Sequence, residues 1–230
     1  MKKKLILGMS AILVALAVAP MFAAFEAHVI NVTATIENAL YVHPESREFG
    51  TVFPQEYKEQ GIFVTFSQSF SATGQNRVGT VEYVIKQKPK PRPAFVNSVG
   101  LDAARQWCHD KVNDPSFLTN CYPSLCPYLS KTPDGHPSPG NDTGVPAFHD
   151  PFDPLSFAKG VINKFGTDLG DTWTIDLAVP CFKGQCSQDW ASFVKKYNPS
   201  VLNPDDYMAP KGMSGQTFGC DLWVEVTKIY

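Results

Sequence analysis

The sequence predicts an all-β fold, namely a jelly-roll-like antiparallel β-sandwich with a long, disulfide-braced insertion of loops and helix. Short segments alternate apolar and polar residues with a period of two, which is typical of half-buried strands. Turn-forming residues separate these segments, and helix and strand do not alternate regularly along the chain. All six cysteines lie between Cys108 and Cys220, in and around the least regular part of the sequence.

Period-two alternation locates the expected strands at residues 28–42, 48–54, 61–70, 81–85, 172–180 and 218–229. The first of these carries an apolar stripe on one face, formed by Ile30, Val32, Ala34 and Ile36. Apolar residues at helical spacing predict a helix at 187–197, and a short helix is expected at 99–107. We therefore expect residues 25–230 to form a single β-sandwich domain.

An irregular insertion is expected at about 89–160. Pro89, Pro91 and Pro93 alternate with cations and favour an extended conformation that ends the sheet. We interpret residues 86–93, which carry four cations, as a solvated linker in preference to a polyanion-binding segment. Residues 131–140 are rich in proline, glycine and aspartate, so no regular element is expected there.

The N-terminus has the pattern of a secretory signal peptide over residues 1–24. Three lysines, Lys2 to Lys4, precede an uncharged, mostly apolar run that ends at Phe25. An uncleaved membrane anchor is the alternative, and the membrane is expected to contact only this segment. Cleavage lowers the basic residues from 20 to 17 against 22 acidic ones, so the net charge falls from −2 to −5. This charge excludes a general nucleic-acid-binding surface.

An even number of cysteines in an exported chain predicts disulfides. The candidates are Cys108, Cys121, Cys126, Cys181, Cys186 and Cys220. Six cysteines allow 15 pairings, and the bond that we favour joins Cys108 to Cys121. A four-cysteine zinc site is the alternative, but its ligands would have wider spacing than zinc ribbons usually use.

No catalytic signature is present in the sequence, so we predict neither an enzyme nor a cofactor. Cys108 and His109 are adjacent, but neighbouring side chains do not face each other as a catalytic pair must. We expect no bound metal. Calcium is the alternative, because the stretch from Asp134 to Asp153 is acidic and rich in turns. Trp223 alternates with the inward stripe of its strand and is the tryptophan expected to be exposed.

Several blocks of the sequence resemble the TasA/camelysin family of exported bacterial proteins. They comprise residues 22–33 and 49–56 near the N-terminus, and 81–89, 126–131 and 218–223 further along. The resemblance implies export and a jelly-roll fold. It also implies assembly into matrix fibres in which one subunit donates an N-terminal strand to the next. The chain departs from the family in its added cysteines and in a shortened element at Phe25-Glu26.

The resulting expectation is an exported structural subunit of a cell-surface layer, a pilus-like fibre or the extracellular matrix of a biofilm. Self-association is expected through exchange of the N-terminal strand, with cell-surface or matrix components as further partners. The strand-exchange candidates are Phe25, Ile30, Val32, Ala34 and Ile36. A monomeric adhesive or glycan-binding module is the alternative, and it would need exposed aromatic residues and a rigid loop site.

Overall fold

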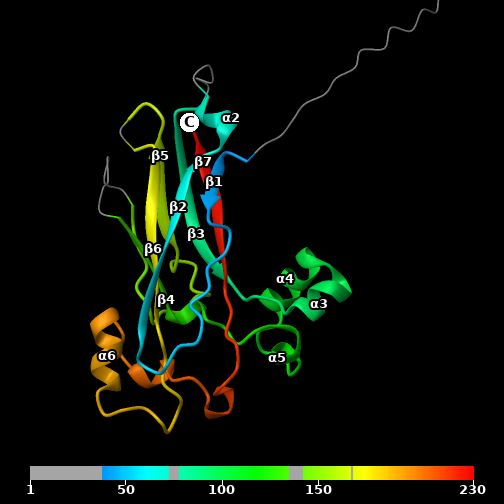
Figure 1. The fold of residues 1–230 in the computed structure, drawn as a ribbon, viewed down its shortest axis with the longest axis vertical. Coiled ribbons are helices and arrows are strands. Elements are labelled where there is room, and N and C mark those ends of the chain that lie inside the picture. The colour runs from blue at the N-terminus through cyan, green and yellow to red at the C-terminus, as the bar shows by residue number, and fades with distance from the viewer. Residues whose placement is uncertain (1–37, 73–77, 135–141, 167) are drawn as a thin grey trace, which may run out of the picture. The chain divides into compact units, whose positions relative to one another are not determined.

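The computed structural model describes residues 38–72, 78–134, 142–166 and 168–230. Within this part of the chain, seven strands form two antiparallel sheets (Figure 1). The first sheet has the order β1 (Leu40–His43), β2 (Tyr57–Phe66), β6 (Gly170–Ala178), β4 (Leu129–Pro133). The second has the order β5 (Ala158–Asn163), β3 (Thr80–Lys88), β7 (Asp221–Ile229). The antiparallel β prediction is confirmed.

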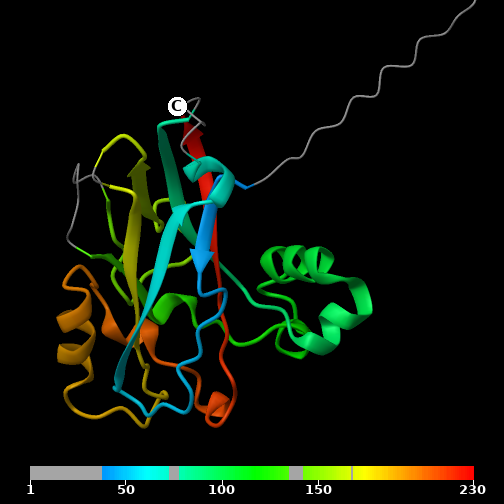
Figure 2. The ribbon, with the colours of Figure 1, turned by 45° about the horizontal axis from the view of Figure 1, so that its top comes forward.

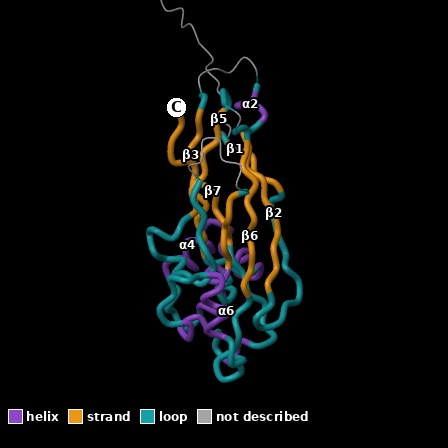
Figure 3. Tube along the Cα trace, turned by 90° about the vertical axis from the view of Figure 1, so that its left-hand side faces the viewer, coloured by secondary structure: helices purple, strands orange, loops and turns teal. Residues whose placement is uncertain are grey.

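Short helices connect and flank the strands. The α-helices are α2 (Gln68–Ser71), α3 (Pro93–Val99), α4 (Leu101–Asp110), α5 (Phe117–Asn120) and α6 (Trp190–Tyr197). The 3-10 helices are η2 (Cys126–Tyr128), η3 (Pro204–Tyr207) and η4 (Lys211–Met213). Helices α3 and α4 stand to one side of the strands (Figure 2), whereas loops and helices gather toward one end of the strand bundle (Figure 3). No helix in the described ranges is both long and apolar enough to span a bilayer.

The core lies between the two sheets, because each strand turns alternate side chains inward. Val81, Tyr83 and Ile85 of β3 are fully buried, and Trp173 and Ile175 of β6 meet them from the other sheet. Tyr83 packs edge-on against Trp173. Gly160 of β5 lies opposite Tyr83, and a Cβ atom at residue 160 would overlap the tyrosine ring. A glycine at this position therefore lets the large aromatic side chain fill the interior.

The structure differs from the sequence prediction at 48–54, which is a loop and not a strand. Gly50 and Gln55 both have positive φ angles, 69° and 62°. The Glu56 backbone nitrogen donates to the Phe53 carbonyl and closes a turn. Left-handed backbone conformations of this kind do not fit a strand, so the apolar run around Phe53 follows the surface instead.

The range 89–160 was expected to be an irregular insertion, but it contains one strand of the first sheet and the start of a strand of the second. Strand β4 includes Lys131 and pairs with β6, although residues 131–140 were expected to lack regular structure. Strand β5 begins at Ala158 and pairs with β3. Lys86 and Lys88 belong to β3 rather than to a solvated linker. In these segments, hydrogen bonding to neighbouring strands determines the structure, although nearby prolines and charged residues favour a loop.

All six cysteines form disulfides. The predicted bond between Cys108 and Cys121 is confirmed, and it joins α4 to the end of α5. The other two bonds join Cys126 to Cys220 and Cys181 to Cys186. Because every thiol is consumed in this way, the four-cysteine zinc alternative and a Cys108 thiolate are both wrong. Disulfides of this number are typical of proteins that fold in an oxidising compartment.

Candidate strand-docking groove

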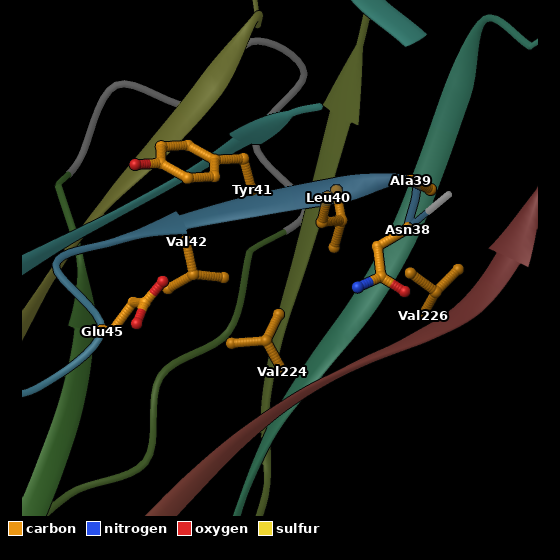
Figure 4. Close-up of a pocket in the computed structure, with 8 residues that line it drawn as sticks. All are labelled: Asn38, Ala39, Leu40, Tyr41, Val42, Glu45, Val224 and Val226. Carbon is orange, nitrogen blue, oxygen red and sulfur yellow. The ribbon is translucent and has the colours of Figure 1, made fainter. Parts of the chain in front are cut away.

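A groove lies between the edge strands of the two sheets, β1 and β7. In the described part of the chain β1 pairs with β2 alone and β7 pairs with β3 alone. The groove has a volume of about 510 Å³, and side chains from both strands point into it (Figure 4). It is lined by Asn38, Ala39, Leu40, Tyr41, Val42, Glu45, Val224 and Val226. An apolar seam with an unpaired backbone edge is therefore open to the surface.

The inward face of β7 is incompletely covered. Val224 pairs with Ile85, and Val226 pairs with Tyr83, so both valines point to the interior side of the sheet. Tyr83 and Ile85 are 0% exposed, but Val226 is 40% exposed. A valine on the inner face of a sandwich is normally buried, because apolar side chains there meet the opposite sheet. The exposure of Val226 thus identifies the place where the sandwich lacks cover.

The groove continues into a larger cavity of about 1120 Å³. Val42, Glu45 and Val224 line both spaces. Core residues from the central strands, among them Ile62 and Ile175, contribute to the wall of the larger cavity. An apolar segment lying along β7 would therefore contact the edge strands and part of the main core.

Several contacts hold β7 in place, although no described strand pairs with one of its edges. The disulfide between Cys126 and Cys220 fastens the residue before the strand to η2. On the outer face, Glu225 accepts hydrogen bonds from Lys86 at 2.8 Å and Lys88 at 3.2 Å. These bonds hold the pKa of Glu225 below its usual range. The strand is thus fixed from β3 and from η2, while the opposite edge remains accessible.

Trp223 does not stand free on the surface as the sequence predicted. Its ring is half-buried and contacts two cations, with Lys88 Nζ 3.5 Å and the Arg105 guanidinium 5.3 Å from the ring centre. Arg105 also pairs with Asp221 at 3.1 Å. The cation–π contacts tie α4 to the outer face of the second sheet. Cations at these distances occupy ring surface that would otherwise be free to stack on a sugar.

The predicted strand-exchange residues Phe25, Ile30, Val32, Ala34 and Ile36 lie outside the described residues. Of the acid-rich stretch from Asp134 to Asp153, residues 135–141 also lie outside them. Asp142 accepts a hydrogen bond from the Val161 backbone nitrogen. Across the described ranges, no group of three or more His, Cys, Asp or Glu side chains is arranged to hold a metal ion.

A buried acidic network lies between the two sheets, where Tyr83 of β3 meets β6. The Tyr83 hydroxyl donates to Asp171, and Trp173 Nε1 donates to the Tyr83 oxygen at 2.7 Å. Burial raises the pKa of Asp171 to about 8 and that of Asp168 to about 6, and nearby carboxylates add to both shifts. Retention of a proton is favoured there, because two negative charges close together in the interior would repel each other. Sequence alternation placed Tyr83 and Trp173 in the core but gave no sign of the acids beside them.

Comparisons with family models, with curated proteins and with solved structures found no match to this chain. The groove between β1 and β7 therefore has to be interpreted from its own geometry and chemistry.

Proposed function

We propose that this protein is an exported structural subunit of a cell-surface fibre or matrix. In this proposal the groove between β1 and β7 accepts residues 25–36 of a second copy. The observation that carries it is the open inner face of β7, where Val226 points to the core side and is still 40% exposed. Addition of a strand there would cover that face and pair the free backbone edge.

The strand arrangement supports the finer proposal of a jelly-roll-like sandwich. A jelly roll has eight strands in two sheets. The described sheet β1-β2-β6-β4 has four strands, whereas β5-β3-β7 has three. One added strand beside β7 would give each sheet four strands and would close the seam beside β1. The proposed position of the donated strand follows from this difference.

The chemistry of residues 25–36 fits the groove. Ile30, Val32, Ala34 and Ile36 alternate with polar residues, so one face of an extended segment is apolar. No proline, lysine or acidic residue lies between Ala27 and Ile36. Natural edge strands that avoid pairing usually carry such residues. This segment lacks that protection, as expected for a strand whose role is to pair.

Export is the second part of the proposal. The signal pattern at 1–24 and the resemblance to the TasA/camelysin family support it, and the three disulfides agree with an oxidising compartment. A strand donated between subunits needs a free start, which cleavage after residue 24 would provide. Export and strand exchange are therefore linked, because the same cut that releases the protein exposes the donor segment.

Electron microscopy and sedimentation of the mature protein test the proposal. We expect the parent to form fibres and a Val32→Pro variant to remain a folded monomer, because proline removes a backbone donor from the added strand. A synthetic peptide of residues 25–36 should bind the Val32→Pro variant. Parent protein that stays monomeric at every concentration and salt tested contradicts the fibre proposal and favours the monomeric adhesive module.

A further inference from the structure

Three polar side chains meet in the interior between the two sheets. Lys131 extends from β4 of the first sheet and Gln87 from β3 of the second, while His149 comes from the loop that precedes β5. Their exposed fractions are 0%, 5% and 7%. Lys131 Nζ contacts Gln87 Oε1, and Gln87 Nε2 contacts His149 Nε2. Buried lysines are rare in proteins, so this cluster needs an explanation.

The hydrogen bonds define the orientation of each group. Gln87 Nε2 donates to the Ser156 carbonyl at 3.3 Å, so the nitrogen of the amide faces that side and the carbonyl faces Lys131. His149 Nδ1 lies 2.7 Å from the Pro146 carbonyl, which can only accept a hydrogen bond. Nδ1 therefore carries the ring proton, and Nε2 is an unprotonated base beside the amide nitrogen.

The lysine has an amide rather than a carboxylate as its partner. In the described part of the chain Lys131 forms no ion pair, and Gln87 is its one side-chain hydrogen-bond partner. Burial lowers the pKa of Lys131 to about 7 and outweighs the attraction of Asp176, which favours the charged form from a distance. Burial also lowers the pKa of His149 to about 4. Near neutral pH, a large fraction of the lysine is a neutral amine, which is a nucleophile.

From this geometry we propose that Lys131 and Gln87 become joined by an intramolecular isopeptide bond, with His149 as the proton-transfer group. The lysine Nζ attacks the Gln87 Cδ atom, and a C–N bond forms there. The bond from Cδ to Nε2 breaks, and Nε2 leaves as ammonia. Nζ loses one proton and the departing nitrogen gains one, and His149 Nε2 carries that proton between them. No oxidant, metal or cofactor is consumed.

The bond would connect the two sheets covalently through the core. Residues 87 and 131 are 44 positions apart in sequence and lie in different sheets. Water is excluded from the site, so hydrolysis of the amide does not compete with its formation. The sequence alone could not indicate this site, because Lys131 lies in a stretch that predicts a loop and Gln87 lies beside a proline-rich run. The inference is independent of strand exchange.

Intact-mass measurement of the reduced, denatured mature protein tests the proposal. The expected mass is lower than the sequence mass by one ammonia molecule, after allowance for signal cleavage. Proteolysis should then give a branched peptide that joins the Gln87 segment to the Lys131 segment. Fully folded protein with the unmodified mass and no branched peptide would overturn the proposal.

Substitutions test which residues take part in the proposed bond formation. Lys131→Met removes the nucleophile and should abolish the mass deficit, whereas Lys159→Met, at a partly exposed lysine of β5, should retain it. His149→Gln should leave a mixture of linked and unlinked chains whose linked fraction grows slowly during incubation. Persistence of the deficit in Lys131→Met would exclude Lys131 as the nucleophile. A His149→Gln variant linked as fast as the parent would remove His149 from the reaction.

Discussion

Val226 and Tyr83 are paired residues of neighbouring strands, yet one is 40% exposed and the other is completely buried. Both point toward the interior of the sandwich. The difference arises because, among the strands that the structure describes, β3 is flanked by two and β7 by one. The uncovered valine therefore lies where a further strand would pack. A substitution of Val226 should thus affect assembly of the subunits without affecting the folding of each one.

Val226→Lys should leave the monomer folded and prevent fibre formation. The side chain is partly in water already, so we expect the free energy of unfolding to change by less than about 1 kcal/mol. A charge in the groove would, however, lose its contact with water beneath a donated strand, which opposes docking. Sedimentation velocity and urea unfolding measure the two effects.

Thr227→Lys is the matched control, because Thr227 is the next residue along β7 and does not line the groove. This control variant should assemble like the parent. Equal assembly of Val226→Lys and the parent would show that the groove is not the docking site.

The disulfides should differ in their contribution to stability. Cys126–Cys220 spans 94 positions and Cys181–Cys186 spans 5. In the chain-entropy model, removal of the longer bond costs about 4–5 kcal/mol and removal of the shorter one about 2 kcal/mol. Paired Cys→Ala substitutions with chemical unfolding measure both losses. A larger loss for the Cys181→Ala/Cys186→Ala variant would contradict this order.

Asp171→Asn should make the unfolding free energy less sensitive to pH. Folding raises the pKa of Asp171 to about 8 from an unfolded value of about 3.9, so the folded state holds a proton that the unfolded state releases. The Asp171 contribution to stability is present below pH 4 and is lost as the pH rises through about 8. Asparagine keeps a hydrogen-bond acceptor for Tyr83 and does not ionise.

We therefore expect the variant to gain roughly 1–3 kcal/mol relative to the parent between pH 5 and pH 8. His149 has a lowered pKa and gives the opposite slope, so the difference in slope between the variant and the parent is the quantity to compare. Urea unfolding of the variant and the parent at pH 5 and at pH 8 measures this difference. Asp102→Asn, at an exposed acid of α4, is the control, and identical slopes for Asp171→Asn and the parent would contradict the assignment.

The sequence predicted those strands in which apolar residues alternate cleanly. Ile62 and Val64 in β2, Tyr83 and Ile85 in β3, and Trp173 in β6 all lie in the core as expected. Alternation works there because the inward positions carry large side chains. One disulfide of the three was also predicted, since a short loop between Cys108 and Cys121 made that pairing favourable.

Other elements could not be predicted, because their inward faces combine one large apolar residue, Ile162 in β5 or Leu129 in β4, with small or charged residues. Strand β5 places Ala158 and Gly160 inward, and β4 places Lys131 there. Their strand state depends on backbone pairing with β3 and β6, which are distant in sequence. The groove was missed for a similar reason, because it exists only where β1 and β7 come together.

The bond between Cys126 and Cys220 has a mechanical consequence for a subunit under tension. A pull on the two ends of the chain passes along β7 to Cys220 and then through the sulfur atoms to Cys126, so it bypasses the chain between these cysteines. The 94 positions between the two cysteines are thereby withheld from extension. At the length of a fully extended chain, they would otherwise release about 300 Å. An oxidised subunit can therefore be stretched by only a fraction of its contour length, and reduction of this one bond would make it far more extensible.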